Sequence, residues 1–174
     1  IDTLRTDRLP FHGYPHNTMP FLNGLAARSV DFARAYAGSS WTAPATASIF
    51  TGLYPFQHGV VMGLLAQKKS IKKDPAIKIN RIPEKVLTLP EVFKAQGYRT
   101  YGISDNPNIS KKQGFHQGFD LLQTHRHTGA KSINKKLLAL AKEIKSSSRY
   151  FLYIHYNDPH RPYKLSLSAE ERSG

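Results

Sequence analysis

The chain has 174 residues, enough for one ordinary domain, and its 25 Lys and Arg against 12 Asp and Glu give a formal net charge of +13. Its 40% of hydrophobic residues, with nine Tyr and nine Phe, can build a core, which argues against wholesale disorder. It has no Cys, so disulfides, zinc–thiolate sites and cysteine nucleophiles are excluded.

The positive charge favours anionic partners, namely nucleic acid, an anionic membrane surface or anionic small substrates, unless it forms only a solvated basic surface. No aromatic and basic residues interleave as in a nucleic-acid-binding motif, so no nucleic-acid partner is expected. No apolar run approaches the roughly 18 residues of a membrane span, so no transmembrane segment is predicted. The composition selects no cellular compartment.

The first half of the chain predicts two helices and one strand. Apolar residues at helical spacing indicate a helix over residues 18–27, and alternating apolar and polar residues indicate a half-buried strand over 30–36. A second helix is predicted over 45–52, where a Pro lies near the first turn and a Gly follows the end. The lysine-rich segment 68–85 is predicted to be an exposed loop, or else the lining of an anionic groove.

The second half alternates helices with strands. A Thr–Glu capping box indicates a helix over 88–96, and the alternating segment 98–104 follows as a strand. An amphipathic helix over 132–145 precedes the nearly continuous apolar run 150–156, which is typical of a strand buried on both faces of a parallel sheet. Strands that alternate with helices predict an α/β fold.

Polar side chains gather where predicted strands end or helices begin, at Asp2, at Thr42 and over residues 157–160. Ligands of open α/β sheets collect at such strand ends, and a helix amino terminus beside Thr42 favours an anion. The carboxylate of Asp2 suits Ca²⁺, Mg²⁺ or Mn²⁺. Together these groups predict a metal-assisted site for a sulfate or phosphate ester. Taken singly, Asp2 has the alternative of a turn residue, Thr42 of a helix N-cap, and His160 of a surface histidine.

Segments 1–7, 42–52 and 151–163 resemble, in this order, the first metal-binding strand end, the nucleophile segment and the histidine-bearing strand of the sulfatase family. That family lies within the alkaline-phosphatase-like superfamily. The resemblance implies an α/β fold with a mixed, mostly parallel central sheet sandwiched by helices, here incomplete. It also implies that residues 1–174 are the amino-terminal part of a sulfatase-like catalytic domain, which agrees with a chain that has Ile1 in place of an initiator Met.

The resemblance further implies metal-dependent cleavage of a sulfate ester. In that scheme Asp2 and Thr42 bind a divalent cation, with Ca²⁺ expected and Mg²⁺ or Mn²⁺ as alternatives. Thr42 is also the catalytic nucleophile, and His160 binds the anionic ester or protonates its leaving group. Asn106 binds the substrate through a hydrogen bond to an oxyanion, unless it only forms a turn before Pro107.

Departures from the family pattern leave other functions open. Sulfatases convert a Cys or Ser at the position of Thr42 to formylglycine, whereas oxidation of Thr would give a ketone, so no formylglycine is expected at Thr42. Thr46 stands where sulfatases carry an Arg that supports the nucleophile. The alternatives are therefore a phosphotransferase or phosphodiesterase that uses Thr42, and a catalytically inactive protein that binds anionic ligands on this scaffold.

Overall fold

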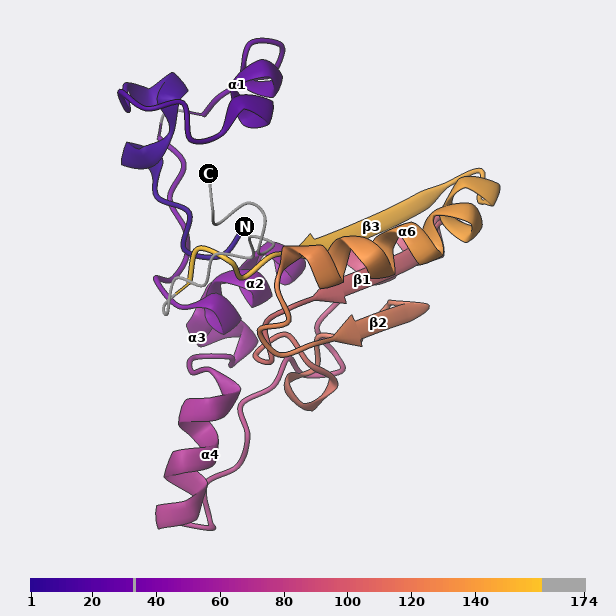
Figure 1. Cartoon of the computed structure of the whole chain (residues 1–174). Coiled ribbons are helices and arrows are strands. Elements are labelled where there is room, and N and C mark those ends of the chain that lie inside the picture. The colour runs from indigo at the N-terminus through magenta and orange to yellow at the C-terminus, as the bar shows by residue number, and fades with distance from the viewer. Residues whose placement is uncertain (33, 161–174) are drawn as a thin grey trace.

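The computed structural model describes residues 1–32 and 34–160, in which helices are layered on a short sheet (Figure 1). The strands are β1 (Arg99–Ser104), β2 (Leu121–Thr124) and β3 (Tyr150–His155), in the order β2-β1-β3. Both pairings are parallel, and Ser104 at the end of β1 lies between Thr124 of β2 and His155 of β3. The carboxyl ends of all three strands therefore meet at one edge of the sheet.

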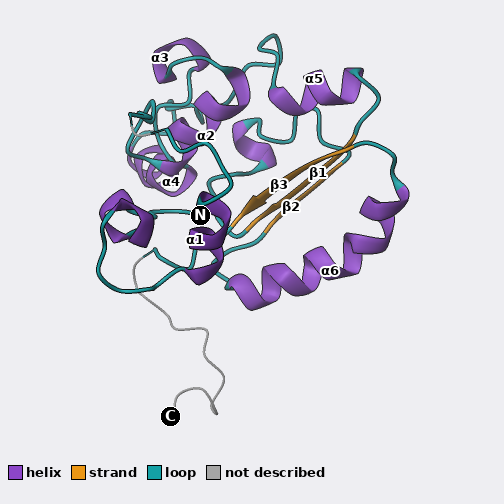
Figure 2. Ribbon diagram, turned by 90° about the horizontal axis from the view of Figure 1, so that it is seen from above, coloured by secondary structure: helices purple, strands orange, loops and turns teal. Residues whose placement is uncertain are grey.

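Helices cover both faces of this sheet (Figure 2). The helix α6 (Ala130–Ser146) lies on one face, and α2 (Thr42–Thr51) and α5 (Leu89–Ala95) lie on the other. Phe50 of α2 is 2% exposed, and its ring contacts the rings of Phe115, Phe119 and Tyr153. This aromatic cluster joins α2 to the sheet and so holds the first turn of α2 near the sheet edge.

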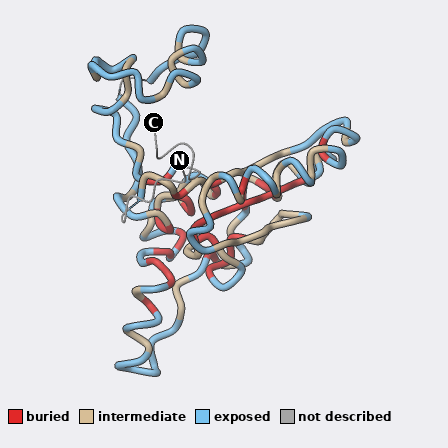
Figure 3. The backbone as a smooth tube through the Cα atoms, in the orientation of Figure 1, coloured by how far each residue is buried: buried red, intermediate tan, exposed pale blue. Residues whose placement is uncertain are grey.

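The remaining helices lie outside these layers. Two of them, α3 (Pro55–His58) and α4 (Leu64–Lys73), follow α2, and α4 reaches away from the sheet (Figure 1). The helix α1 (Pro20–Ala26) belongs to a largely exposed region of the tube in Figure 3. The short 3₁₀ helices are Thr6–Arg8, Pro10–His12 and Lys111–Gln113. In the part of the chain that is described, no helix is long and apolar enough to cross a membrane.

Local sequence signals predicted several elements to within a few residues. The helices expected over 18–27, 88–96 and 132–145 correspond to α1, α5 and α6, and the strands expected over 98–104 and 150–156 correspond to β1 and β3. The capping box of α5 is present, because Glu91 accepts a hydrogen bond from the backbone of Thr88 at 2.8 Å. The expected α/β fold is confirmed, and the described sheet is wholly parallel.

The other predictions need correction. No described residue of segment 30–36 lies in a strand, and Val30 and Tyr36 are 81% and 88% exposed. The alternating pattern predicted a strand here, but a strand forms only when a partner strand pairs with it. Part of the predicted loop over 68–85 belongs to the helix α4, which buries Leu64 and Gln67 one turn apart. The strand β2 was missed because it has only four residues. Residues 161–163 of the histidine-bearing segment lie outside the described residues.

Candidate functional site

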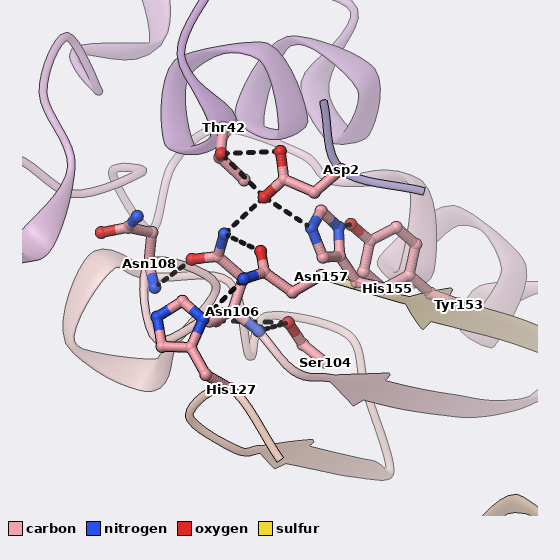
Figure 4. A network of polar contacts seen from close by, with 9 residues as sticks. All are labelled: Asp2, Thr42, Ser104, Asn106, Asn108, His127, Tyr153, His155 and Asn157. Carbon is pink, nitrogen blue, oxygen red and sulfur yellow. Dashed lines mark hydrogen bonds and ion pairs between the residues drawn. The ribbon is translucent and has the colours of Figure 1, made fainter. Parts of the chain in front are cut away.

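The candidate site lies at the carboxyl edge of the sheet, where Asp2 meets the ends of β1 and β3 (Figure 4). The backbone N–H of Asp2 donates to the carbonyl oxygen of Tyr156 at 2.8 Å, which places Asp2 directly beyond β3. The hydroxyl of Thr42, 40 positions further along the chain, lies 3.2 and 3.3 Å from the two carboxylate oxygens of Asp2 and donates to them. The structure thus brings together two residues that the sequence pattern proposed for one site.

Thr42 is the first residue of α2 and not its N-cap. Trp41 occupies the N-cap position with an extended backbone, and its carbonyl oxygen accepts the first helical hydrogen bond, from the N–H of Ala45. Pro44 is tolerated inside the first turn, where the backbone nitrogen needs no helical acceptor. The predicted helix start at residue 45 and the N-cap interpretation of Thr42 are therefore wrong, and the hydroxyl points at a carboxylate.

The carboxylate of Asp2 is 9% exposed and surrounded by donors. Asn106 Nδ2 donates to Oδ2 at 2.6 Å, and His155 Nε2 lies 3.3 Å from the same oxygen. Burial by itself raises the pKa of Asp2, but the interactions with His155, Asn106 and Thr42 outweigh burial and hold this pKa below its ordinary value. Asp2 is therefore ionised at neutral pH, the form in which a carboxylate is a hard oxygen donor.

His155 is oriented by its other ring nitrogen. The hydroxyl of Tyr153 lies 2.9 Å from Nδ1 of His155. Burial raises the pKa of Tyr153, so its hydroxyl is protonated in this contact. Because the ionised carboxylate of Asp2 only accepts, Nε2 of His155 carries a proton and donates it to Asp2.

Asn106 links Asp2 to a second histidine through a directed chain of hydrogen bonds. An ionised carboxylate only accepts, so the Nδ2 of Asn106 faces Asp2, and the same nitrogen donates to Oδ1 of Asn157 at 3.0 Å. The Oδ1 of Asn106 accepts from the backbone of Asn108. Asn157 must then turn its Nδ2 to His127, whose Nδ1 lies 2.6 Å away. Nδ1 of His127 is therefore an acceptor, and its ring proton is on Nε2.

Backbone strain is concentrated beside this site. His127 has φ 52° and Thr3, the neighbour of Asp2, has φ 53°, and no other non-glycine residue in the described ranges has a positive φ. Each such conformation costs about 1–2 kcal/mol and persists where the surroundings hold it. At His127 the support comes from the buried carboxylate of Asp105, which accepts hydrogen bonds from Thr128 and Gly129 at 2.7–2.9 Å.

His160 lies beside this network and is exposed. Its backbone N–H donates to the carbonyl oxygen of Asn157 at 3.0 Å, and its ring centroid lies 6.1 Å from that of His127. Three imidazoles, those of His127, His155 and His160, therefore lie in or beside the network around Asp2. Asn106 forms the predicted turn, and its Nδ2 donates to Asp2 and to Asn157, so its hydrogen bond to a substrate oxyanion stays a prediction.

Sequence reasoning missed three members of the network: His127, Tyr153 and His155. Asn157 belongs to residues 157–160, whose polar side chains were expected at the site. A usable signal existed for Tyr153 and His155, because they lie in the apolar run over 150–156, whose carboxyl end was already expected at the site. For His127 no signal was available, because its position depends on the missed strand β2, whose end leads to it.

The described residues do not by themselves form a metal site, but two of them have the donor atoms that a divalent cation binds. The described ranges contain no group of three or more His, Cys, Asp or Glu side chains arranged to hold a metal ion. The carboxylate of Asp2 and the hydroxyl of Thr42 are hard oxygen donors side by side, the kind that Ca²⁺ and Mg²⁺ prefer. These two residues fit one side of the coordination sphere of a divalent cation.

Comparisons with known proteins agree with one another. The sequence model of the Sulfatase family matches residues 1–173. Arylsulfatase A of Bos taurus is 33% identical over 133 residues, which are 71% of this chain and 24% of that protein. The N-sulphoglucosamine sulphohydrolase of Homo sapiens is 27% identical over 148 residues, which are 82% of this chain and 27% of that protein. The chain thus spans about a quarter of the length of these curated relatives.

Among solved structures, the phosphonate monoester hydrolase of Agrobacterium radiobacter has the same fold, with a TM-score of 0.66 and 17% sequence identity. The similarity covers 98% of this chain and 42% of that one. At this sequence identity the similarity concerns the fold alone. The three-stranded parallel sheet and its helices correspond to less than half of that larger structure.

Proposed function

The chain belongs to the sulfatase family, with an alkaline-phosphatase-like fold, and from this premise we propose that the protein containing it hydrolyses a sulfate ester. Residues 1–174 form the amino-terminal part of its catalytic domain. One observation supports assigning the reaction to particular residues. The hydroxyl of Thr42, in the first turn of α2, lies 3.2 Å from the carboxylate of Asp2. A hydroxyl beside an ionised carboxylate and at a helix amino terminus is placed for nucleophilic attack.

In the proposed reaction, Asp2 orients Thr42 through their hydrogen bond, and Thr42 Oγ1 attacks the sulfur of the ester. The bond from Thr42 to sulfur forms as the bond to the leaving oxygen breaks, and Asp2 takes the hydroxyl proton. The backbone N–H groups of the first turn of α2 stabilise the negative charge that develops on the ester during this attack. Water then hydrolyses the ester on Thr42.

Asp2 and Thr42 also hold a divalent cation in this proposal, with Ca²⁺ expected and Mg²⁺ or Mn²⁺ as alternatives. When bound, the cation lowers the pKa of the hydroxyl and offsets negative charge on the ester. His160 binds the anionic ester or protonates the leaving oxygen. His127 adds a donor of fixed direction, because its Nδ1 accepts from Asn157 and its Nε2 carries the proton.

A second candidate function is transfer or hydrolysis of a phosphate ester by Thr42. The observation that favours it is the nature of the nucleophile, an unmodified secondary hydroxyl that cannot become formylglycine. The same attack by Thr42 on phosphorus gives a phosphorylated threonine, which water or an alcohol then cleaves. Asn106 supports either reaction by holding Asp2 with a hydrogen bond of 2.6 Å.

The proposal is tested on the full-length protein with 4-nitrophenyl sulfate and 4-nitrophenyl phosphate, which separate the two reactions. Thr42→Ala is expected to lower kcat at least about 100-fold and Thr42→Ser to retain activity, because only Ser keeps the nucleophile. The matched control Thr51→Ala, at the far end of α2, is expected to keep full kcat. Full turnover by Thr42→Ala would contradict the nucleophile, and no turnover of either ester by the wild type would favour an inactive, anion-binding protein.

A further inference from the structure

A pocket separate from the candidate site opens between α4 and the end of β2. It has a volume of about 500 Å³. Its floor includes the apolar side chains of Leu64, Phe119 and Leu122. Three lysines stand on its walls, one from α4 and two from the 3₁₀ helix that precedes β2: Lys68, Lys111 and Lys112.

The charge of this pocket is strongly positive. Within the described ranges, no carboxylate forms an ion pair with Lys68, Lys111 or Lys112. The one carboxylate that lines the pocket, Asp120, is already paired with Lys94 at 2.8 Å. Three uncompensated ammonium groups around one pocket attract an anion of matching size.

The two lysine-bearing walls are held against each other by buried amides. The carbonyl oxygen of Met62, just before α4, accepts a hydrogen bond from Gln67 of α4 and another from Gln113, at 2.6 and 2.9 Å. Gln67 is 2% exposed and Gln113 is fully buried. Because these contacts are already made, the backbones that carry Lys68, Lys111 and Lys112 need no rearrangement to receive a ligand.

One hydroxyl in the pocket still lacks a partner. The Oγ of Ser110 is buried and forms no hydrogen bond with any residue in the described part of the chain. A buried hydroxyl without a partner loses free energy unless a ligand supplies one. Once rotation of the Ser110 side chain brings Oγ to the pocket surface, an oxyanion accepts from it and meets the lysine ammonium groups at the same time.

The pocket and the candidate site belong to one stretch of chain. Asn106 donates to Asp2, and Ser110, four residues later, lines the pocket, so their Cα atoms are at most about 14 Å apart. Between them Asn108 packs against Gly63 at the start of α4, where an added Cβ would meet Asn108 Oδ1 at 2.9 Å. A ligand of a few sugar units is long enough to reach both.

We propose that this pocket binds a second anionic group of the substrate, so that the substrate is a polyanion, such as a multiply sulfated oligosaccharide, of which one ester reaches Thr42. The inference rests on the proposed function for the reacting ester. Lys68, Lys111, Lys112 and Ser110 hold the non-reacting oxyanion by charge and hydrogen bonds. The apolar floor contacts the uncharged face of the sugar that carries it.

The experiment measures binding of a heparin-derived hexasaccharide to the full-length protein by calorimetry in 0.15 M NaCl, which screens diffuse charge effects. Lys111→Gln/Lys112→Gln is expected to weaken binding about tenfold, since it removes two of three charges from the pocket. Lys72→Gln/Lys73→Gln, which removes the same charge from the end of α4 outside the pocket, is the matched control and is expected to weaken it less than about twofold.

Equal losses in the two pairs would overturn the inference in favour of diffuse charge attraction, and so would the absence of binding by the wild type. Turnover of 4-nitrophenyl sulfate, which has one anionic group, is expected to be unchanged in the control pair Lys72→Gln/Lys73→Gln. A wild type that binds the hexasaccharide through Lys111 and Lys112 but cleaves no ester would refute the proposed function and leave an anion-binding pocket. The two failures are thus distinguishable.

Discussion

Asn157 Nδ2 donates to Nδ1 of His127 at 2.6 Å, and this contact determines where the imidazole carries its proton. The direction of the bond follows from Asp2, because the ionised carboxylate orients Asn106 and Asn106 in turn orients Asn157. A buried carboxylate therefore determines the tautomer of an exposed histidine through two amides. The consequence is an exposed ring that carries its proton on Nε2 and whose centroid lies 6.1 Å from that of His160.

The first prediction concerns His127. His127→Asn removes the imidazole but tolerates the left-handed backbone at φ 52°, so we expect unfolding free energy to change by less than about 1 kcal/mol. We expect kcat/KM for the ester to fall about tenfold, the effect of one lost hydrogen bond to a charged group. In the wild type, ¹⁵N NMR of the imidazole should show the proton on Nε2. An Nδ1-protonated ring, or unchanged kcat/KM, would contradict this role.

The second prediction concerns the cation. In Asp2→Asn, a neutral amide replaces the ionised carboxylate, so we expect Ca²⁺ to bind more weakly and kcat to fall at least about 100-fold. Adding Ca²⁺ after EDTA treatment should raise the Tm of the wild type, because a ligand that binds only the folded state stabilises it, and should leave the Tm of Asp2→Asn unchanged. Equal Tm shifts in the two proteins would place the cation elsewhere. Mg²⁺ and Mn²⁺ titrations identify the preferred ion.

The third prediction concerns stability as a function of pH. Burial lowers the pKa of the fully buried His58, and its Nδ1 accepts from the N–H of Val60, so the folded state favours the neutral ring. Because the folded pKa is below the unfolded value of about 6.5, this stability is complete above about pH 6.5 and is lost as pH falls toward the folded pKa. The loss is at most about 1.4 kcal/mol per pH unit for this one proton.

His58→Gln should therefore reduce the slope of unfolding free energy between about pH 6.5 and 5, as measured by urea denaturation. Burial also lowers the pKa values of His116 and His125, so a smaller slope of the same sign should remain. An identical slope in wild type and variant would show that His58 does not titrate on unfolding as described.

The fourth prediction concerns the core that positions Thr42. Phe50→Ala removes a 2% exposed ring that contacts Phe115, Phe119 and Tyr153, and we expect it to lower unfolding free energy by about 3–5 kcal/mol. Phe56→Ala, at a 79% exposed ring, is the control and should change it by less than about 0.5 kcal/mol. Similar values for both in chemical denaturation would mean that the cluster around Phe50 does not stabilise α2 on the sheet.

Local structure could be predicted wherever the signal lies within a few residues of chain. The capping box of Thr88 and Glu91 and the apolar run over 150–156 predicted α5 and β3, because a cap is made by residues three positions apart and a continuous apolar run of strand length is typical of the interior of a parallel sheet. Segment 30–36 was predicted wrongly for the opposite reason. Its alternation is a strand pattern, but a strand also needs a hydrogen-bonded neighbour, which no local pattern reveals.

The sequence by itself determined the family, the α/β layering and the candidate residues Asp2, Thr42, Asn106 and His160, because each belongs to a short motif that can be read in place. Only the tertiary structure decided how they act together. Asn106 meets Asp2 across 104 positions and Asn157 across 51, and Asn157 meets His127 across 30. These contacts exist because parallel pairing aligns the ends of β1, β2 and β3 at one edge of the sheet. The hydrogen bonds made there then determine which ring nitrogen of His127 carries the proton.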